Sequence, residues 1–520
     1  YNFYLDDAKV ETEWLSRANT RIDNIRKRDM QISIKDNDGQ PVSGVGVKVN
    51  QIKHRFAFGA AFANDQTEND DYLGFFKNHY EWAVMENASK WWNNEPTQGN
   101  ITYTEADAIY NWCDANGITM RGHSIYWAVE DWVQQWIKNL DLTGLQNAVE
   151  NRMDSAVNHF KGKFVHWDVL NESTQDFYFQ NRLDQDDYWE SEYGVKVRPW
   201  MFQMANDIDP DAKLFVNEYG VVARRGHLEP YKTHIADLIG DGAIIHGVGV
   251  ESHVEEVFLP ASEIYARFES LAELGLPIWC TEYDWPDEDV NKRADKLEKW
   301  FRIAFSHWAV EGILMWGFWE NSMWREDAYI VDSDWTLNTA GERYESLMDE
   351  WTTSAEGETN ANGNFDVRGF HGTYEILVTP DGGTTITTTV ELEPDANTLI
   401  SPLTIPYYFV IDGTDGLTKA AFDKYGNFII EGDLIQNANA EQLNPESGDL
   451  LVIKNGNQEV VFRLSSDGNV FIKEILSERQ SAINPSSGDL LVLKDGTDIV
   501  ICIEENGDIK IKERLWQFKY

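Results

Sequence analysis

The chain has 520 residues, too long for one ordinary domain and sufficient for a large core with appended modules. Its formal net charge of −44 repels nucleic acid and anionic membranes, because binding to phosphate groups depends on Lys and Arg. No apolar run approaches the length of a membrane span, and the chain opens on Tyr1 rather than Met. We therefore expect a processed protein, secreted or at the cell surface, with no nucleic-acid partner and no membrane insertion.

The first residues predict a helix followed by two strands. Residues 6–28 mix charged side chains with apolar ones at helical spacing. Residues 30–49 then alternate apolar and polar side chains around the turn at 37–41. We expect residues 1–54 to form a helix and a β-hairpin that pack on the main domain.

Short apolar segments recur between helix-length stretches over residues 55–351. The predicted strands are 55–61, 82–87, 118–127, 164–172, 213–218, 244–253, 277–284 and 313–319. Eight strands that alternate with helices are typical of a (β/α)₈ barrel, and roughly 300 residues is a normal size for one. We expect an α/β protein with a TIM barrel at 55–351, whose active site lies where the strands end.

The composition changes after Trp351. Of the 21 tryptophans, 20 lie between Trp14 and Trp351. The segment 352–363 is poor in apolar residues, which predicts a linker or loop, and residues 364–393 then alternate as strands. We expect a small β-sandwich-like module at 352–395.

The tail, residues 396–520, contains an internal repeat. The run Asn-Pro-Glu-Ser-Gly-Asp-Leu-Leu-Val at 444–452 returns with one change at 484–492, and a looser copy lies at 422–430. The repeat predicts three β-meander units. Their turns are expected at Gly426, Gly468 and Gly507. Such units need to stack on one another or on another copy of the chain, so a homo-oligomer through the repeats is one hypothesis.

The sequence shows no recognisable metal-ligand spacing or disulfide framework. Cys113, Cys280 and Cys502 lie far apart and are odd in number, so we interpret them as buried thiols. Acidic turns such as 412–416 lack the full ligand spacing of a calcium loop and are better explained as β-turns. We predict no metal site and no required cofactor.

Two glutamates each end or follow a short strand-like segment. Glu172 ends the run Trp-Asp-Val-Leu-Asn-Glu, and Glu282 lies in Trp-Cys-Thr-Glu-Tyr-Asp. Cleaving a glycosidic bond with retention needs a carboxylic acid that protonates the leaving oxygen and a carboxylate that attacks the sugar. The acid must hold its proton near neutral pH, and a nearby carboxylate of like charge raises its pKa. A retaining pair lies about 5–5.5 Å apart, against about 6.5–9.5 Å for an inverting pair.

Several motifs over about residues 5–350 resemble glycoside hydrolase family 10, the β-1,4-xylanases. The similar segments are 85–91 with Glu95, Pro96 and Gly99; 121–123 with Trp127; and 167–172, 216–219, 247–253 and 281–284. The resemblance implies a retaining endo-1,4-β-xylanase. Its substrate would be xylan or xylo-oligosaccharides, cleaved at internal bonds by double displacement.

The resemblance also implies roles for single residues. Glu172 would be the general acid and base, and Glu282 the nucleophile. His253 and Asp284 would orient the nucleophile, and Asn171 would bond the 2-hydroxyl of the cleaved sugar. The expected substrate-binding residues are Glu86, Asn87, Lys90, His123, Trp127, Asn217, Glu251, Trp316 and Trp324. The tryptophans in this set are candidate platforms for the apolar face of a sugar. Three others stay undecided: Trp91, Trp92 and Trp319.

Four positions depart from the family pattern. The usual histidine after Trp127 is Ala128. Glutamates replace the usual residues at Glu130, Glu218 and Glu251. These changes affect contacts around the cleaved bond and leave the catalytic pair intact.

Two other functions remain open. One is a retaining β-1,4-glucanase of the same fold, which would need room for a C6 hydroxymethyl group near Lys90 and Trp316. The other is a non-catalytic carbohydrate-binding or adhesive protein, because a fold does not determine a function.

Overall fold

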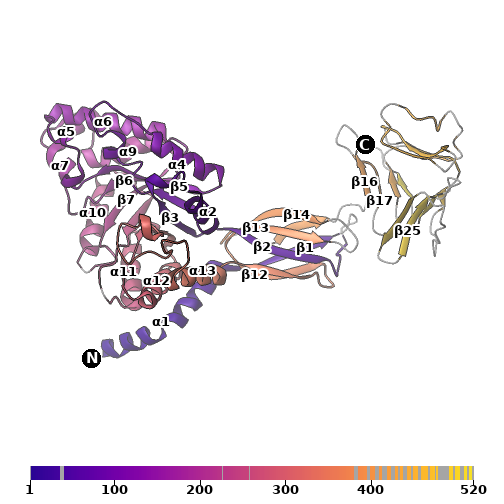
Figure 1. The fold of residues 1–520 in the computed structure, drawn as a ribbon, viewed down its shortest axis with the longest axis horizontal. Helices are drawn as coiled ribbons and strands as arrows, with labels where there is room; N and C mark the ends of the chain where they lie inside the picture. Colours follow the sequence, from indigo (N-terminus) through magenta and orange to yellow (C-terminus); the bar gives the residue numbers. More distant parts are fainter. Residues whose placement is uncertain are drawn as a thin grey trace.

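The computed structural model describes residues 2–35, 40–224, 226–256, 258–379 and 385–394, and shorter segments between 399 and 517. Figure 1 shows three parts: a barrel surrounded by helices, a β-sandwich beside it, and a C-terminal β module. In the described part of the chain, no helix is long and apolar enough to cross a membrane.

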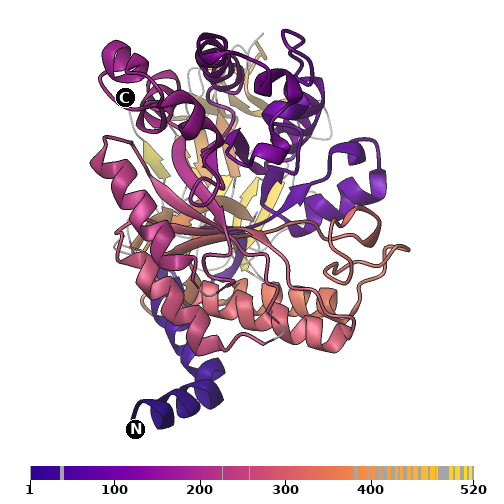
Figure 2. The ribbon, with the colours of Figure 1, turned by 90° about the vertical axis from the view of Figure 1, so that its left-hand side faces the viewer.

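Eight parallel strands close into a barrel in the order β10-β3-β4-β5-β6-β7-β8-β9. The strands are β3 (Ala57–Phe62), β4 (Trp82–Met85), β5 (Thr119–Trp127), β6 (His166–Asn171), β7 (Lys213–Tyr219), β8 (Gly247–Glu251), β9 (Ile278–Tyr283) and β10 (Val310–Met315). Every predicted strand is present, so the prediction of a TIM barrel is confirmed. Figure 2 views the barrel from the side opposite the sandwich, with helices around it.

Helices follow the strands and cover the outside of the barrel. The longer ones are α2 (Asp70–His79), α4 (Thr104–Ala115), α6 (Leu142–His159), α9 (Val197–Ile208), α10 (Leu228–Gly240), α11 (Ala261–Ala272), α12 (Val290–Phe305) and α13 (Thr339–Trp351). Short helices are α3 (Trp91–Asn94), α5 (Gln135–Lys138), α7 (Tyr178–Leu183) and α8 (Tyr188–Tyr193). Helix α12 shows why such segments form: Asp289 caps its first turn, and Leu297, Trp300 and Phe301 bury one face at helical spacing.

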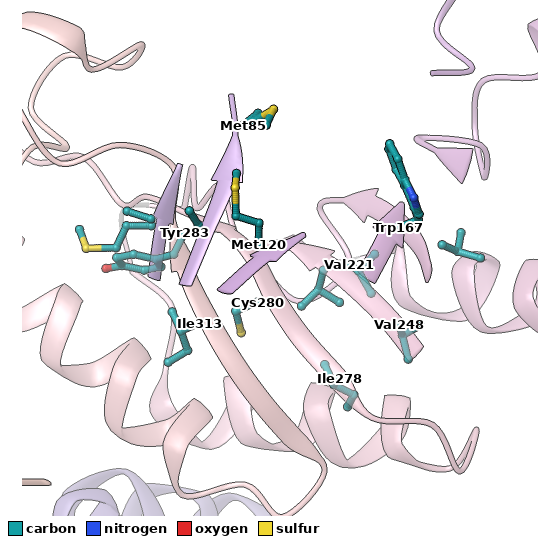
Figure 3. Packing of buried hydrophobic residues seen from close by; sticks show 14 of the residues in the cluster. Met85, Met120, Trp167, Val221, Val248, Ile278, Cys280, Tyr283 and Ile313 are labelled. Carbon is teal, nitrogen blue, oxygen red and sulfur yellow. The ribbon is translucent and has the colours of Figure 1, made fainter. Parts of the chain in front are cut away.

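The main core lies between the strands and these helices. Figure 3 shows part of it, with Met120, Val248, Cys280 and Ile313 contributed by four different strands. Cys113 and Cys280 are buried free thiols, as predicted. The side chain of Cys502 lies outside the described residues.

The predicted N-terminal hairpin is wrong. Strands β1 (Lys27–Lys35) and β2 (Gly46–His54) belong to different sheets, with orders β12-β1-β15 and β11-β2-β13-β14. The partners are β11 (Ser354–Glu358), β12 (Asn364–Phe370), β13 (Gly372–Thr379), β14 (Ile386–Leu392) and β15 (Leu399–Thr404). Strands on both sides of the barrel sequence therefore form one sandwich, whose core joins Ile32 and Val49 to Ile376.

The domain boundaries change accordingly. The predicted linker at 352–363 contains β11, an edge strand that pairs antiparallel with β2. Its side chains are exposed or only half-buried, which explains why its sequence lacks an apolar alternation. Strand β15, expected in the tail, pairs parallel with β1 and belongs to the sandwich. The sandwich thus combines parts of the predicted segments 1–54, 352–395 and 396–520.

Helix α1 (Asn2–Arg26) connects the sandwich to the barrel. Ala18 and Ile22 are buried in the barrel core. The guanidinium of Arg26 donates to the carbonyl oxygens of Phe305 (2.8 Å), His307 (2.7 Å) and Val310 (2.6 Å). Because a hydrogen bond from a charged donor contributes about 1.5–3 kcal/mol, Arg26 is a main attachment point of the N-terminal segment.

We expect Arg26→Met to lower the free energy of unfolding by about 3 kcal/mol or more, because three carbonyl oxygens lose a charged donor. Urea denaturation followed by tryptophan fluorescence measures this loss. The matched control on the same helix is Arg17→Met. Among the residues that the structure describes, Arg17 is exposed and pairs only with Glu13, at 3.5 Å, so its loss should cost less than about 1 kcal/mol. Equal effects of the two changes would contradict the assignment.

The C-terminal module contains three four-stranded sheets built from the described strands. The first sheet contains β16 (Phe409–Asp412), β17 (Thr418–Phe422), β18 (Phe428–Ile430) and β27 (Leu515–Gln517). The second contains β19 (Leu434–Ile435), β20 (Leu451–Lys454), β21 (Val460–Leu464) and β22 (Val470–Ile472). The third contains β23 (Leu476–Ser477), β24 (Leu491–Asp495), β25 (Asp498–Ile503) and β26 (Ile509–Ile511). Each sheet contains a three-stranded antiparallel meander, in agreement with the three predicted repeat units.

The three units pack on one another. Ile430, Phe462 and Ile503 come from different units and share one buried cluster. Strand β27 pairs with β18, so the end of the repeat returns to its beginning. The predicted turn glycines and the acidic turn at 413–416 lie outside the described residues.

Candidate active site

A cleft of about 630 Å³ opens at the carboxyl ends of the barrel strands. Its lining is Glu86, Asn87, Lys90, Trp92, His123, Trp127, Trp132, Asn171, Glu172, Tyr219, Gly220, Arg224, Glu251, His253, Glu255, Glu282, Trp316, Trp324 and Arg325. Every predicted site residue lines this cleft except Asp284 and Asn217. Both of these are buried and contact residues that do line it. The barrel therefore brings together side chains that lie far apart in the sequence.

Glu172 stands directly after β6, with its backbone in the left-handed region at φ 54°. Its N–H donates to the carbonyl oxygen of Asn217 at 2.9 Å, which holds this strained conformation in place. Burial raises the pKa of Glu172 to about 8, and the charges of Glu282 and Glu218 add to the rise, while a hydrogen bond from Trp127 opposes it. The predicted like-charge effect is therefore present, but burial is the larger cause.

Glu282 lies in β9 and is held by donors on both carboxylate oxygens. Asn217 Nδ2 lies 2.8 Å from Oε1, and His253 Nε2 lies 3.2 Å from Oε2. Burial alone would raise the pKa of Glu282, but His123, His253 and Lys90 outweigh it and lower the pKa to about 2. Glu282 is therefore ionised at any pH at which the protein would work.

Two histidines flank Glu282, and each has an aspartate on its other ring nitrogen. His253 Nδ1 lies 2.7 Å from Asp284 Oδ2, as predicted for an orienting pair. His123 Nδ1 lies 2.9 Å from Asp168 Oδ2, and its Nε2 lies 3.8 Å from Glu282 Oε1. His123 was predicted to bind substrate; its position also supports the nucleophile electrostatically.

The side-chain amide of Asn217 joins the two halves of the site. Its Nδ2 lies 2.8 Å from the Asn171 amide and 3.1 Å from Glu251 Oε1, in addition to its contact with Glu282. Its oxygen accepts from the Thr281 hydroxyl at 2.6 Å. The Asn171 amide in turn lies 3.3 Å from Glu172 Oε1. A chain of two amides thus connects the glutamate pair.

The unusual glutamates Glu218 and Glu251 are both buried. Burial raises the pKa of Glu218 to about 7, although the backbone N–H of Thr174 donates to it at 2.8 Å. Burial also raises the pKa of Glu251, and the charges of Glu282 and Glu172 raise it further. A protonated Glu251 has nearly the shape of the glutamine that is usual there. Two departures remain: Ala128 is buried directly after β5, and Glu130 is exposed in η2 (Glu130–Trp132). Neither residue lines the cleft.

A polar cluster with Lys90 at its centre occupies one wall. Lys90 Nζ donates to Asn87 Oδ1 at 3.0 Å, and Asn87 Nδ2 donates to Glu86 Oε1 at 3.1 Å. The ammonium lies 4.5 Å from the ring centroid of Trp127 and 5.7 Å from that of Trp316. These polar groups are suited to binding the hydroxyl groups of a sugar. The same contacts also stabilise the wall of the cleft, which is a structural role.

The predicted tryptophan platforms differ in exposure. Trp324 is 54% exposed, and its indole N–H donates to Asp284 Oδ2 at 2.9 Å. Trp127 stacks on Trp132 with centroids 4.9 Å apart, and Trp132 is 53% exposed. Trp316 is only 7% exposed and presents an edge to His123. Of the undecided residues, Trp92 lines the cleft, whereas Trp91 and Trp319 pack in the core.

Sequence reasoning missed several lining residues: Trp132, Tyr219, Arg224, Glu255 and Arg325. Arg325 pairs with Asp284, and Arg224 pairs with Glu255 at the rim. Arg325 could have been suspected from its place next to Trp324. The others lie on loops or strand ends whose approach to the cleft depends on the fold.

Three of the site residues could also hold a metal ion. Ligand atoms of Glu251, His253 and Glu282 lie within 4.8 Å of one another. The His253 and Glu282 atoms concerned are already joined by the 3.2 Å contact described above. A metal bound there would occupy the carboxylate that the chemistry needs.

A closed parallel barrel with two oppositely perturbed carboxyl groups at the ends of its strands defines the class of (β/α)₈ glycoside hydrolases. A family model described as glycosyl hydrolase family 10 matches residues 48–345, more than half of the chain. The chain belongs to this family, as its motifs suggested.

Curated relatives match most of this chain. Anti-sigma-I factor RsgI6 of Acetivibrio thermocellus is 43% identical over 395 residues, covering 76% of this chain and 50% of that protein. Endo-1,4-beta-xylanase 1 of Arabidopsis thaliana is 38% identical over 359 residues, covering 68% of this chain and 37% of that protein. The chain thus spans half or less of the length of these two curated relatives.

Among solved structures, xylanase 10B from Thermotoga petrophila RKU-1 in complex with xylobiose superimposes with a TM-score of 0.50. The match has 23% sequence identity and covers 57% of this chain and 94% of that chain. At this identity the likeness supports the fold.

Proposed function

We propose that this chain is a retaining endo-1,4-β-xylanase that hydrolyses internal bonds of xylan. One observation carries the proposal: Glu172 and Glu282 share a cleft, with pKa values of about 8 and about 2. Across neutral pH one is therefore a carboxylic acid and the other a carboxylate. This division of roles is what double displacement requires. The name of the Arabidopsis thaliana relative supports xylan as the substrate.

In the first step, Glu282 attacks the anomeric carbon while Glu172 gives its proton to the leaving glycosidic oxygen. Asn217 and His253 hold the attacking carboxylate in position and keep it ionised. In the second step, Glu172, now ionised, removes a proton from water, which displaces Glu282 from the sugar. Two inversions at one carbon give net retention.

The retaining outcome can be read from the first product. Proton NMR of the hydrolysis of a xylo-oligosaccharide should show the β-anomer at the new reducing end before mutarotation mixes the anomers. An initial α-anomer would mean that water attacks directly, and the double-displacement proposal would be abandoned.

We propose a pentose rather than a hexose substrate. The ammonium of Lys90 lies against the rings of both Trp127 and Trp316, the region in which a C6 hydroxymethyl group would need room. One extra carbon that does not fit changes kcat/KM by about 10–200-fold. We therefore expect 4-nitrophenyl xylotrioside to be cleaved at least about 10-fold faster than the cellotrioside. Equal rates would favour the glucanase alternative.

Glu251→Gln should leave kcat/KM at pH 6 within about threefold of the parental value, because a glutamine has nearly the shape of a protonated glutamate and also provides both a carbonyl acceptor and a donor. Glu251 has a raised pKa, so its neutral form is lost as pH rises, and any loss of parental activity that comes from its ionisation should be absent from the Gln variant. The alkaline limb of the Gln variant should therefore lie at the same or a higher pH. A pH profile of kcat/KM for both proteins measures this difference.

The control variant is Glu251→Ala, because it leaves Asn217 without this acceptor. If Gln and Ala were equally damaging at pH 6, Glu251 would be needed in its ionised form.

A second candidate is a barrel that binds xylan without cleaving it. It is favoured by the similarity to a relative named as an anti-sigma factor. Tight retention of the chain on insoluble xylan, with no reducing sugar released, would support this alternative.

A homo-oligomer through the repeats remains a proposal. The shared core of the three units favours stacking within one chain. Sedimentation of a chain ending at residue 404, which keeps β15 in the sandwich, should show whether the repeats change the oligomeric state.

Secretion or display at the cell surface is likewise a proposal. Antibody detection in cell fractions of the source organism would test it.

A further inference from the structure

A second cavity, of about 510 Å³, lies at the opposite end of the barrel from the catalytic cleft. Its barrel side is formed where strands begin: Trp82 opens β4, His166 opens β6, and Trp279 lies near the start of β9. Its other side is formed by residues after the sandwich strand β12, including His371. The cavity therefore lies between the barrel and the sandwich, a common position for binding sites.

The barrel side of this cavity is aromatic. The ring centroids of Trp82 and Trp279 are 4.9 Å apart, and His166 contacts Trp279 edge to face at 4.5 Å. Gly312 makes room for Trp279, because a Cβ atom at this position would lie 2.6 Å from the indole ring. Trp308 at the rim is 59% exposed. Trp279 is only 4% exposed, so Trp308 and the half-buried Trp82 offer the indole surface that can pack against the apolar face of a sugar ring.

Two buried polar atoms of the lining have no hydrogen-bond partner within the described part of the chain. They are His166 Nδ1 and Trp279 Nε1. Burial lowers the pKa of His166, so its ring is neutral and offers one donor and one acceptor. Trp279 offers a donor. Each of the two atoms has under 1 Å² of accessible surface, so they lie behind the cavity wall, and the hydroxyl groups of a ligand would bond the exposed lining groups Arg55 and Glu311.

We propose that this cavity binds a saccharide of one or two rings, separately from the catalytic cleft. The mixed lining suits a neutral sugar better than an ion, because the carboxylate of Glu311 lines the same cavity as the guanidinium of Arg55. A ligand there contacts barrel and sandwich at once. It should therefore stabilise their junction as well as occupy the site, since any ligand that binds only the folded chain raises its stability.

The test uses a Glu282→Gln chain, which prevents turnover, so that binding is measured without relying on the proposed activity. Xylobiose, cellobiose and arabinose are titrated calorimetrically at millimolar concentrations. We expect at least one of them to occupy two sites per chain. In a crystal soaked with that sugar, density should appear against Trp82 and Trp279 as well as in the catalytic cleft.

A second substitution identifies the site. Adding His166→Phe keeps an aromatic ring but removes the nitrogens, and it should leave one site. Trp308→Ala, at an exposed position, should weaken the same site without disturbing the core. The matched control is His79→Phe, which removes another histidine stacked on an aromatic ring, Phe75, outside the cavity, and should leave two sites.

The proposal would be overturned by one site per chain for all three sugars, by water alone in the soaked cavity, or by binding at crystal concentration only. It would also be overturned if both His166→Phe and Trp308→Ala chains, folded by circular dichroism, kept two sites. Failure of xylan hydrolysis by the parental chain would leave the result unaffected.

Discussion

Glu282→Ala is expected to reduce kcat for xylan by at least about 10⁴-fold, on the scale seen when a covalent nucleophile is removed from other enzymes. Binding of substrate should change little, because the cleft keeps its remaining polar and aromatic lining. Release of reducing sugar from xylan measures the loss. Added azide is small enough to enter the space left by the carboxylate, and should produce an α-glycosyl azide from an activated aryl xyloside.

The matched control is Glu130→Ala, an exposed glutamate outside the cleft. Its kcat should remain within about twofold of the parental value, as for most surface positions. If the Glu282 variant kept more than one hundredth of the parental kcat, or if azide gave the β-product, another residue would be the nucleophile.

Glu172→Ala should have the second largest effect, a fall of about 10²–10⁴-fold in kcat/KM on xylan, which is the usual contribution of general acid and base catalysis. The loss should depend on the leaving group. A dinitrophenolate leaves without protonation, so formation of the glycosyl-enzyme from a dinitrophenyl xyloside should be nearly parental. Its breakdown should be slow, because no base activates water, and azide should give a β-glycosyl azide.

The pH profile offers a further readout for Glu172. Its pKa is raised to about 8, and the protonated form is the one needed in the first step. Parental kcat/KM should therefore fall as pH rises through about 8, and the Ala variant should lose the part of this limb that Glu172 contributes. On the acid side, kcat/KM is lost only as Glu282 becomes protonated near its pKa of about 2, if the fold survives. An unchanged alkaline limb in the variant would assign it to another group.

Much of the barrel could be predicted from local sequence. Each barrel strand is a short apolar segment between helical patterns, and the polar residues of the site follow those segments directly, as with Glu172 after β6. In a parallel barrel all carboxyl ends meet at one face. Strand positions in the sequence therefore predict which side chains converge, even for Glu172 and Glu282, which are separated by more than a hundred residues.

The sandwich could not be predicted in the same way. Strands β1 and β2 look like a hairpin because they are adjacent in sequence and the residues between them are of turn-forming types. Their actual partners, β12 and β13, lie more than 300 residues away. Alternation of apolar and polar residues shows which face of a strand is buried, but it does not show which other strand pairs with it. Pairing between strands that precede and follow the barrel therefore leaves no signal in the local sequence.

The sequence was sufficient for the barrel, the repeat units and most of the polar residues that converge on the cleft, because these follow from local periodicity and from motifs in chain order. Tertiary structure alone decided how those residues behave. Burial raises the pKa of Glu172, whereas neighbouring cations lower that of Glu282. The side chain of Asn217 contacts Glu282 and connects it to the rest of the site. The side chain of Trp316 is buried, whereas that of Trp132 is exposed to solvent. The burial and hydrogen bonding of a group depend on every element that packs around it. They therefore cannot be deduced from the adjacent residues in the sequence.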